Sequence, residues 1–214
     1  DLAKQYNADI SVCGSWYDYQ GIKKPKFVFE ELAILDKVKG LDELLKREMY
    51  NVSPPTKLFR KLLFENIRFK ENTMVDDIHV IYKVFANADK VAAKGKPLYS
   101  FRKHDGNMTG FIQTNKLSPA ILNEYLGAFK ERSEYLSKKV PAIAERARYS
   151  EWSYMISMCD KIEKYECYDC KEQYIAMIKE LTKSYNRIIK SPFITQKEKE
   201  KLDKYIASSN IEQE

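Results

Sequence analysis

The sequence predicts a mixed α/β protein, mostly α by content, with a partial α/β layer followed by a helical C-terminal region. Two observations support this prediction. In residues 1–112, short segments with alternating apolar side chains are interleaved with segments of helical spacing. From about Pro119 onward, apolar residues recur at helical spacing almost without interruption. We therefore expect two domains, residues 1–112 and residues 113–214.

Composition narrows the class of protein further. Of the 214 residues, 44% are hydrophobic and 32% are charged, enough apolar side chains to build a core and too many for a disordered chain. With 7 Gly and 7 Pro, the chain is neither collagen-like nor a turn-dense all-β protein. A net charge of +6 is a mild excess and does not indicate nucleic-acid binding. The four cysteines are too few for a disulfide scaffold.

No targeting signal stands out in the sequence. The first nine residues are polar and lack the apolar core of a signal peptide, and no apolar run approaches the ~20 residues that span a bilayer. We therefore expect a cytoplasmic protein with free thiols.

Several elements are expected in the first half of the chain. Residues 8–19 alternate and are rich in Ile, Val, Trp and Tyr, which predicts a strand. Residues 21–26 contain Gly and Lys-Pro-Lys and predict a turn. Residues 40–49 are helix formers with Leu on one face. After the break at residues 53–55, residues 56–65 predict a second short amphipathic helix.

The later elements follow the same reasoning. Asp76 or Asp77 is expected to cap a helix that ends at Ala86, and residues 89–103 predict two short strands around Lys-Gly-Lys-Pro. Beyond Pro119 we expect a long helix that stops at Pro141, two further helices around residues 152–162 and 174–188, and a short last helix over residues 196–206.

Common catalytic signatures are absent from the sequence. It contains no Gly-rich phosphate loop, no Gly-x-Ser-x-Gly and no His-Glu-x-x-His. Two histidines, His79 and His104, are too few for a His-rich metal site. Cys167 and Cys170 have the spacing of zinc ligands but no second pair, so free thiols near a helix start are the better interpretation.

Four segments, taken in order, resemble the C-terminal half of bacterial family 2 glycosyltransferases of the GT-A fold. They are ADISVCGSWYDY (residues 8–19), KLFRKLLFENIRF (57–69), VDDIHVIYKVF (75–85) and ADKVAAKGKPLYSFRKHDGNMTGF (88–111). In that family a Lys-Leu-Tyr/Phe-Arg segment leads into an Ile-Arg-Phe strand, a Glu-Asp pair heads a helix, and a Pro-Leu-Tyr-x-Tyr/Phe-Arg strand precedes a Gly/Asn-Ser-x-Thr turn. Here Asp76 replaces the Glu, Pro55 stands where many relatives carry Trp, and Asn107 replaces the usual Ser.

The resemblance implies an inverting, nucleotide-sugar-dependent glycosyltransferase that acts in surface polysaccharide or related glycan synthesis. It implies that Asp77 is the general base and that Asp76 shapes the acceptor site. His104 would contact the diphosphate or its metal, with Arg102 supporting charge neutralisation. Lys57 and Arg60 would meet the acceptor or the phosphates.

Simpler interpretations of the same residues stay open. The two aspartates can serve only to cap a helix. His104 can be a surface-loop histidine, and Lys57 and Arg60 can form part of a solvated basic face.

The resemblance also implies a cofactor and partners. A divalent metal, Mg or Mn, would be bound mainly by the nucleotide-binding half with its Asp-x-Asp element, which the 214 residues do not contain. We therefore expect these residues alone to be catalytically inactive. The expected partners are a nucleotide-sugar donor and a glycan or lipid-linked acceptor, with no nucleic acid. Peripheral association with the inner face of the membrane and a homodimer are compatible with this interpretation.

An alternative from another class is a helical interaction or scaffold module without catalytic activity. The many Tyr and Lys residues in the helical C-terminal region support it.

Overall fold

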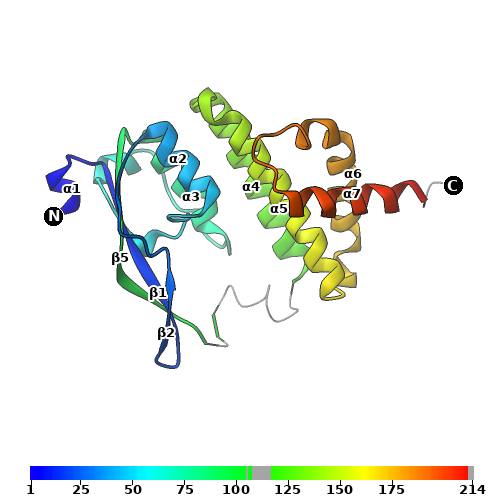
Figure 1. The fold of residues 1–214 in the computed structure, drawn as a ribbon, viewed down its shortest axis with the longest axis horizontal. Coiled ribbons are helices and arrows are strands. Elements are labelled where there is room, and N and C mark those ends of the chain that lie inside the picture. Colours follow the sequence, from blue (N-terminus) through cyan, green and yellow to red (C-terminus); the bar gives the residue numbers. More distant parts are fainter. Residues whose placement is uncertain (105, 108–116, 212–214) are drawn as a thin grey trace. The chain divides into compact units, whose positions relative to one another are not determined.

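The computed structural model describes residues 1–104, 106, 107 and 117–211. They form two compact units. The sheet unit contains Asp1–Asn107 and Glu134–Ala144, and the helical unit contains the described residues of Met108–Ser133 and Glu145–Glu214. This mixed α/β arrangement, a curled mixed sheet followed by a helical C-terminal region, confirms the predicted fold class (Figure 1). The expected boundary between residues 112 and 113 lies outside the described residues.

The sheet unit is built on five strands in the order β2-β1-β5-β3, with β4 also paired to β1. The β1–β5 pair is parallel, and the other pairs are antiparallel. The strands are β1 (Ile10–Tyr19), β2 (Ile22–Lys26), β3 (Leu32–Asp36), β4 (Lys57–Phe59) and β5 (Lys90–Arg102). The helical elements of the N-terminal segment are α1 (Leu2–Gln5), α2 (Lys37–Lys46), η1 (Pro54–Thr56), η2 (Lys61–Phe64) and α3 (Asp76–Asn87).

The sheet unit has its core between the strands and the helices α2 and α3, which lie on the same side of the sheet (Figure 1). Ile81, Tyr82 and Phe85 of α3 are buried, as the helical spacing predicts. The fully buried Tyr50 donates a hydrogen bond of 2.9 Å from its hydroxyl to the carbonyl oxygen of Gly40, which ties the segment after α2 to this core.

The turn expected over residues 21–26 is in fact the strand β2. Gln20 and Gly21 both have positive φ, 54° and 93°, which is the backbone of a tight two-residue hairpin turn. The Asp18 carboxylate accepts a 2.7 Å hydrogen bond from the Gly21 amide and closes this turn. The reversal is therefore confined to two residues, and the following Lys-Pro-Lys can pair with β1.

The prediction of a helix over residues 56–65 is wrong. Residues Lys57–Phe59 form β4, which pairs with the beginning of β1, and a short 3-10 helix follows. Pro54 and Pro55 interrupt the chain just before β4, and Arg60 is extended, so the apolar residues cannot continue as one helix. The Ile67–Phe69 segment, which the resemblance predicts as a strand, has no regular secondary structure.

The two strands expected over residues 89–103 are one strand, β5. Its pairing with β1 continues across an irregularity, where the partners of Cys13, Gly14 and Ser15 are Lys94, Pro97 and Tyr99. Continued pairing on both sides of this bulge keeps the strand whole. The turn expected after it extends to Thr109, which lies outside the described residues.

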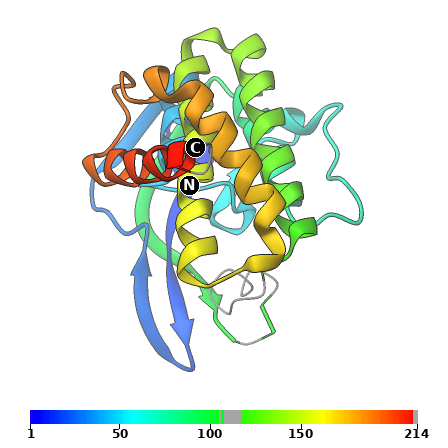
Figure 2. The same ribbon diagram turned by 90° about the vertical axis from the view of Figure 1, so that its right-hand side faces the viewer.

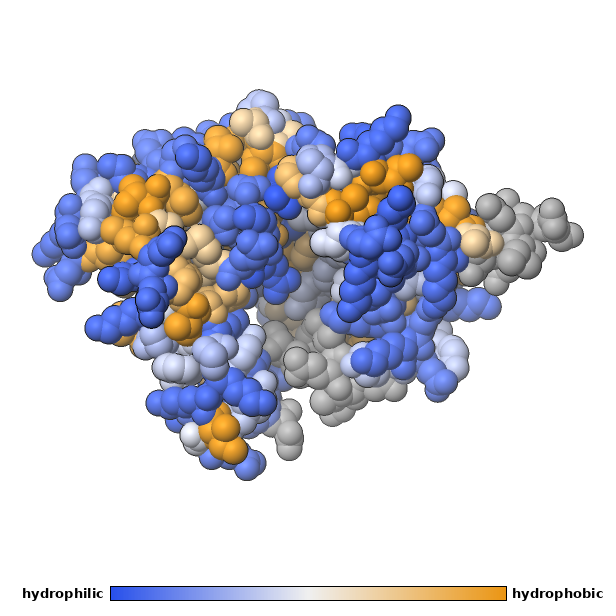
Figure 3. Space-filling view, in the orientation of Figure 1, coloured by the Kyte–Doolittle hydropathy of each residue, from blue (hydrophilic) through white to orange (hydrophobic). Residues whose placement is uncertain are grey.

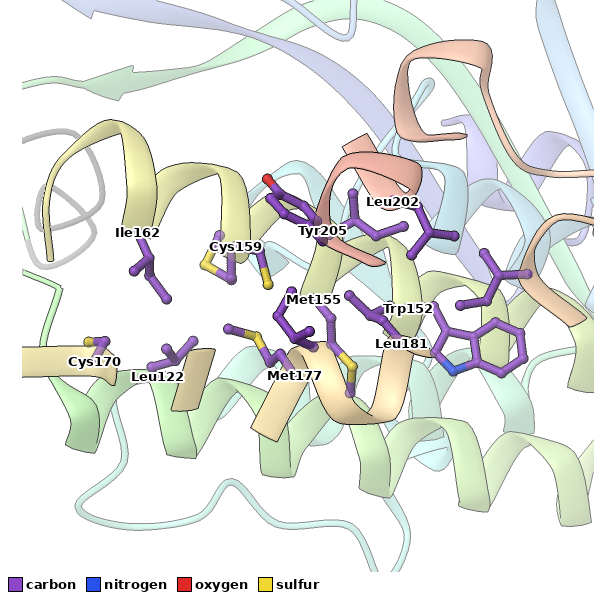
Figure 4. Close-up of a cluster of buried hydrophobic side chains, with 14 of the residues drawn as sticks. Leu122, Trp152, Met155, Cys159, Ile162, Cys170, Met177, Leu181, Leu202 and Tyr205 are labelled. Carbon is purple, nitrogen blue, oxygen red and sulfur yellow. The ribbon is translucent and has the colours of Figure 1, made fainter. Parts of the chain in front are cut away.

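The helical unit confirms the predicted helical pattern after Pro119. Its elements are most of α4 (Pro119–Lys139), α5 (Ala144–Lys164), η5 (Tyr168–Cys170), α6 (Lys171–Ile188) and α7 (Gln196–Ile211) (Figure 2). The last residues of α4, the 3-10 helix η4 (Pro141–Ile143) and the first residue of α5 belong to the sheet unit. Apolar side chains from these helices point toward one another in one cluster, which includes Trp152, Met177, Leu181, Leu202 and Tyr205 (Figure 4).

One partly buried polar contact fixes the last helix of this unit. The Glu198 carboxylate of α7 accepts hydrogen bonds from the hydroxyls of Tyr149 and Ser153, both on α5. These bonds lower the pKa of Glu198 against the opposing effect of burial. The contact joins elements that are far apart in the sequence.

The surface is mainly hydrophilic on the side shown in Figure 3, with separate apolar patches. Among the described residues, no helix combines the length and apolar character needed to cross a bilayer.

Candidate functional site

The six expected site residues do not form one cluster. Lys57 pairs with Val12 in the β4–β1 ladder, whereas Arg102 pairs with Asp18 in the β1–β5 ladder. Val12 and Asp18 are six positions apart, or about 20 Å along a strand that rises ~3.3 Å per residue. The expected residues therefore belong to different places along β1.

Asp77 and Lys57 are close enough to interact electrostatically. Asp77 lies in the first turn of α3 and is half-buried. Burial raises the pKa of its carboxyl above the ordinary value, and the neighbouring Asp76 raises it further. The charges of Lys57 and Arg47 act in the opposite direction, as does a hydrogen bond from the backbone of Ile78. Asp77 is therefore a partly desolvated carboxylate within reach of two cations.

Asp76 has a local structural role beside it. Its side chain is exposed, and its Oδ1 accepts a 2.8 Å hydrogen bond from the Asp77 amide. The N-cap residue of α3 is Val75, so both aspartates lie within the first turn, where negative charge is favourable. Asp76 thus helps to hold the backbone from which Asp77 projects.

Lys57 is an unusual lysine because its side chain is buried, at 8% exposure. Its Nζ donates to the Ser53 carbonyl oxygen at 2.6 Å and to the Thr56 hydroxyl at 3.3 Å. The ammonium also lies 5.8 Å from the centre of the Tyr50 ring. Burial, the main cause, and the charge of Lys26 lower the pKa of Lys57, Cys13 and Asp77 act in the opposite direction, and the resulting pKa is about 7.

Replacing Lys57 with Met should change how stability depends on pH. A lysine with a lowered folded pKa binds its proton more weakly in the folded than in the unfolded protein, so it destabilises the fold below pH 7. The free energy of unfolding should rise between pH 7 and pH 9 in the unaltered protein as this penalty disappears. Lys57→Met, which keeps the volume, should show a smaller rise, of which only the part due to Lys26, with its pKa of about 8, remains. Urea unfolding at several pH values measures it, and equal slopes for both proteins would contradict the assignment.

Two further cations lie in this charged neighbourhood, and sequence reasoning missed both: Arg47 acts on Asp77, and Lys26 acts on Lys57. The Lys26 ammonium lies 4.3 Å and 4.6 Å from the ring centres of Phe101 and Tyr17. Burial and, to a lesser extent, the charge of Arg47 together lower its pKa to about 8. Arg47 is exposed and ends α2 in the left-handed conformation, with φ of 65°. We call Lys26, Arg47 and Lys57 the basic cluster.

Arg60 lies elsewhere and is engaged in the structure. Its Nε forms a 3.0 Å ion pair with Asp9, and its amide donates to the Asp9 carbonyl oxygen at 2.9 Å. The other carboxylate oxygen of Asp9 accepts from the amides of Asp89 and Lys90. Arg60 therefore helps to join β4, β1 and β5 at the beginning of the sheet.

Arg60→Ala should lower the free energy of unfolding by about 1 kcal/mol, since it removes a half-exposed ion pair and two side-chain hydrogen bonds, to the Ala8 carbonyl oxygen and the Asn7 side chain. Lys61→Ala is the control: it removes an exposed neighbouring cation and should change stability by less than about 0.5 kcal/mol. Chemical denaturation measures both. A loss of activity without a loss of stability in Arg60→Ala would instead place Arg60 in the functional site.

His104 and Arg102 lie near the far end of β1. His104 is exposed, and its Nδ1 accepts a 3.2 Å hydrogen bond from the Gly106 amide. Asn107 closes the same turn, because its side-chain oxygen accepts from the His104 amide at 2.8 Å. Arg102 is also exposed. The contacts of His104 within the described residues are those of a surface turn.

The cysteines do not form a metal site in the described part of the chain. No group of three or more His, Cys, Asp or Glu side chains there could hold a metal ion. Cys167 and Cys170 form no disulfide, and burial raises the pKa of each thiol.

The helical unit contains a cavity of about 210 Å³. It is lined mainly by apolar side chains, including Leu126, Met155 and Met177. The acidic group in its wall, Glu151, is buried and forms a 2.9 Å ion pair with Arg148. Because Glu151 is paired with Arg148, it is part of a structural ion pair in the cavity wall and not an unpaired acid or base.

Comparison with known proteins does not identify the chain, since it matches no family model and no curated sequence.

Proposed function

We propose that these residues form the acceptor-activating part of an inverting glycosyltransferase that uses a nucleotide sugar and builds a surface polysaccharide or related glycan. The ordered resemblance of four segments to family 2 glycosyltransferases supports the reaction type. The observation that carries the proposal is the position of Asp77, a half-buried carboxylate at the start of α3 beside Lys57 and Arg47. We further propose that the reaction takes place in the cytoplasm, at the inner face of the membrane where the acceptor is lipid-linked.

In the proposed reaction, Asp77 is the proton acceptor. The acceptor hydroxyl gives its proton to the Asp77 carboxylate while its oxygen forms a bond to the anomeric carbon of the donor sugar. The bond from that carbon to the diphosphate oxygen breaks, and the electron pair leaves with the nucleoside diphosphate. Attack from the side opposite the leaving group inverts the anomeric configuration.

The environment of Asp77 suits this role. A base works best when its pKa is raised toward the working pH while it still remains ionised. Burial raises the pKa of Asp77, whereas the two nearby cations limit the rise. Asp76, whose carboxylate accepts a hydrogen bond from the Asp77 amide, is a positioning residue in this proposal.

The divalent cation that the resemblance implies does not fit the described residues. They contain no cluster of three ligating side chains, and the sequence contains no Asp-x-Asp element. The proposal therefore includes no step through a metal ion on this chain.

Because the proposal requires a nucleotide-binding part, the transfer reaction is tested in the natural protein that contains these residues. Purified protein is incubated with a panel of nucleotide sugars and the membrane-derived acceptor fraction. We expect one donor to be consumed and the product to have the opposite anomeric configuration, read from its proton NMR coupling at C1. Retained configuration, or no turnover of any nucleotide sugar, would contradict the proposal.

A further inference from the structure

We propose that the acceptor carries an anionic group, a carboxylate or a phosphate, which the basic cluster binds at the edge of β1 between β4 and β2. This inference rests on the proposed function, because it assigns the acceptor that Asp77 would deprotonate.

The topology places the two lysines of the cluster on one edge of β1. Strand β5 occupies the other edge, so β4 and β2 both pair on the edge away from it. Along β1, the pairing with β4 ends at Val12, and the pairing with β2 starts at Ser15. Lys57 lies opposite Val12 and Lys26 opposite Ser15, so the two lysine positions are separated by about 10 Å along β1. The strand edge at Cys13 and Gly14 lies between them.

The charges at this place do not balance. Lys26, Arg47 and Lys57 form no ion pair within 4.0 Å among the described residues of the sheet unit, where the recorded ion pairs involve other residues. Asp77 is the half-buried carboxylate in electrostatic reach of Lys57 and Arg47, and Asp76 beside it is exposed. Desolvating cations without paired anions is costly, so a bound oxyanion would offset part of that cost.

The chemistry of the cluster favours an oxyanion. Lys and Arg side chains together supply the charged hydrogen-bond donors that bind carboxylates and phosphates. Tyr17 and Phe101 flank Lys26 and shield its ammonium from water, which strengthens its interaction with an anion. Because Asp77 lies in the same charged neighbourhood, the anion bound here would be part of the molecule whose hydroxyl Asp77 deprotonates.

Anion binding should also be coupled to proton uptake. The pKa of Lys57 is lowered to about 7, so at neutral pH a substantial fraction of this group is uncharged. A nearby anion favours the charged form and would draw a proton from solvent.

The test uses the 214-residue chain and amide NMR titration. Methyl glucuronide and glycerol phosphate are the anionic probes, and methyl glucoside is the neutral probe of matched shape. Uridine diphosphate, without an attached sugar, represents the diphosphate part of the donor. We expect both anionic probes to shift amide signals near Lys26, Arg47 and Lys57, while methyl glucoside leaves them unchanged.

Variants tie the binding to the cluster. Lys26→Gln, Arg47→Gln and Lys57→Met should each weaken binding of the anionic probes by roughly tenfold, as expected for the loss of one charged hydrogen-bond donor. Lys23→Gln, on the exposed part of β2, is the matched control and should bind as the unaltered chain does. Amide spectra with the dispersion of the unaltered chain verify that each variant is folded.

Each outcome decides the inference. Binding of the anionic probes that is lost in the cluster variants and kept in Lys23→Gln supports it. Absence of binding, or equal binding of methyl glucoside, would overturn it. Binding of uridine diphosphate but of neither other anionic probe would also overturn it, because it would assign the cluster to the donor. Transfer is not measured here, so a negative result leaves the role of Asp77 standing, and a failed transfer assay leaves the binding result intact.

Discussion

Asp77→Asn should lower turnover by roughly 10²–10⁴-fold, the usual contribution of a positioned general base. Asn has nearly the same shape, but its amide cannot take the proton of the acceptor hydroxyl. The substitution also removes the repulsion with Asp76 that now raises the pKa of Asp77, so the fold should be retained. Turnover and melting temperature are measured on the same preparation of the natural protein.

Asp76→Asn is the matched control for this prediction. The side-chain oxygen of the introduced asparagine can still accept the hydrogen bond from the Asp77 amide, so turnover should fall by less than about tenfold. Near-normal turnover in Asp77→Asn would show that Asp77 only stabilises the helix start. Joint loss of activity and thermal stability in both variants would make the acidic pair structural.

Gly95→Ala should destabilise the sheet unit on the order of 3 kcal/mol, the upper end of the usual cost of overpacking. A Cβ at Gly95 would lie 2.0 Å from the Phe29 backbone nitrogen and 2.5 Å from the Phe29 carbonyl oxygen. Gly14 is similarly crowded, with a Cβ position 2.6 Å from the Phe27 carbonyl oxygen. Backbone atoms cannot move aside as a side chain can, so the segment that follows Lys26 must shift.

Gly127→Ala provides the control for the stability effect. No atom lies within 4 Å of a Cβ at this exposed position of α4, so Ala should raise helix stability by about 0.5–1 kcal/mol. Urea unfolding of both variants measures the contrast. If Gly95→Ala unfolds at the same urea concentration as the unaltered chain, the close approach of residues 27–29 to β5 is not tight.

Elements with long, uniform patterns could be predicted from the sequence. The helices after Pro119 and the helix at Asp76–Asn87 follow the 3.6-residue spacing of their apolar residues. β4 could not be predicted from the sequence, because a strand of three residues forms only through its pairing with β1. The hairpin of β1 and β2 depends on two left-handed residues, Gln20 and Gly21, and composition alone does not locate such a turn between strands.

The candidate site was only partly predictable for the same reason. The resemblance singles out Asp77 and Lys57, and the structure brings their charges within reach of each other. Lys26 and Arg47 are missed because their positions depend on the β1–β2 pairing and on where α2 ends. The sequence could not separate Arg60 from this site either, because its partner Asp9 is distant in sequence.

The most direct test of the account is a carbon-13 NMR titration of the Asp77 side-chain carboxyl in the 214-residue chain and in its Lys57→Met variant. We predict a pKa above the ordinary value for aspartate in the unaltered chain, because burial and Asp76 both raise it. Removal of the Lys57 charge should raise the pKa of Asp77 further. An ordinary or lowered pKa that does not change in Lys57→Met would contradict the claim that Asp77 and Lys57 form one coupled site.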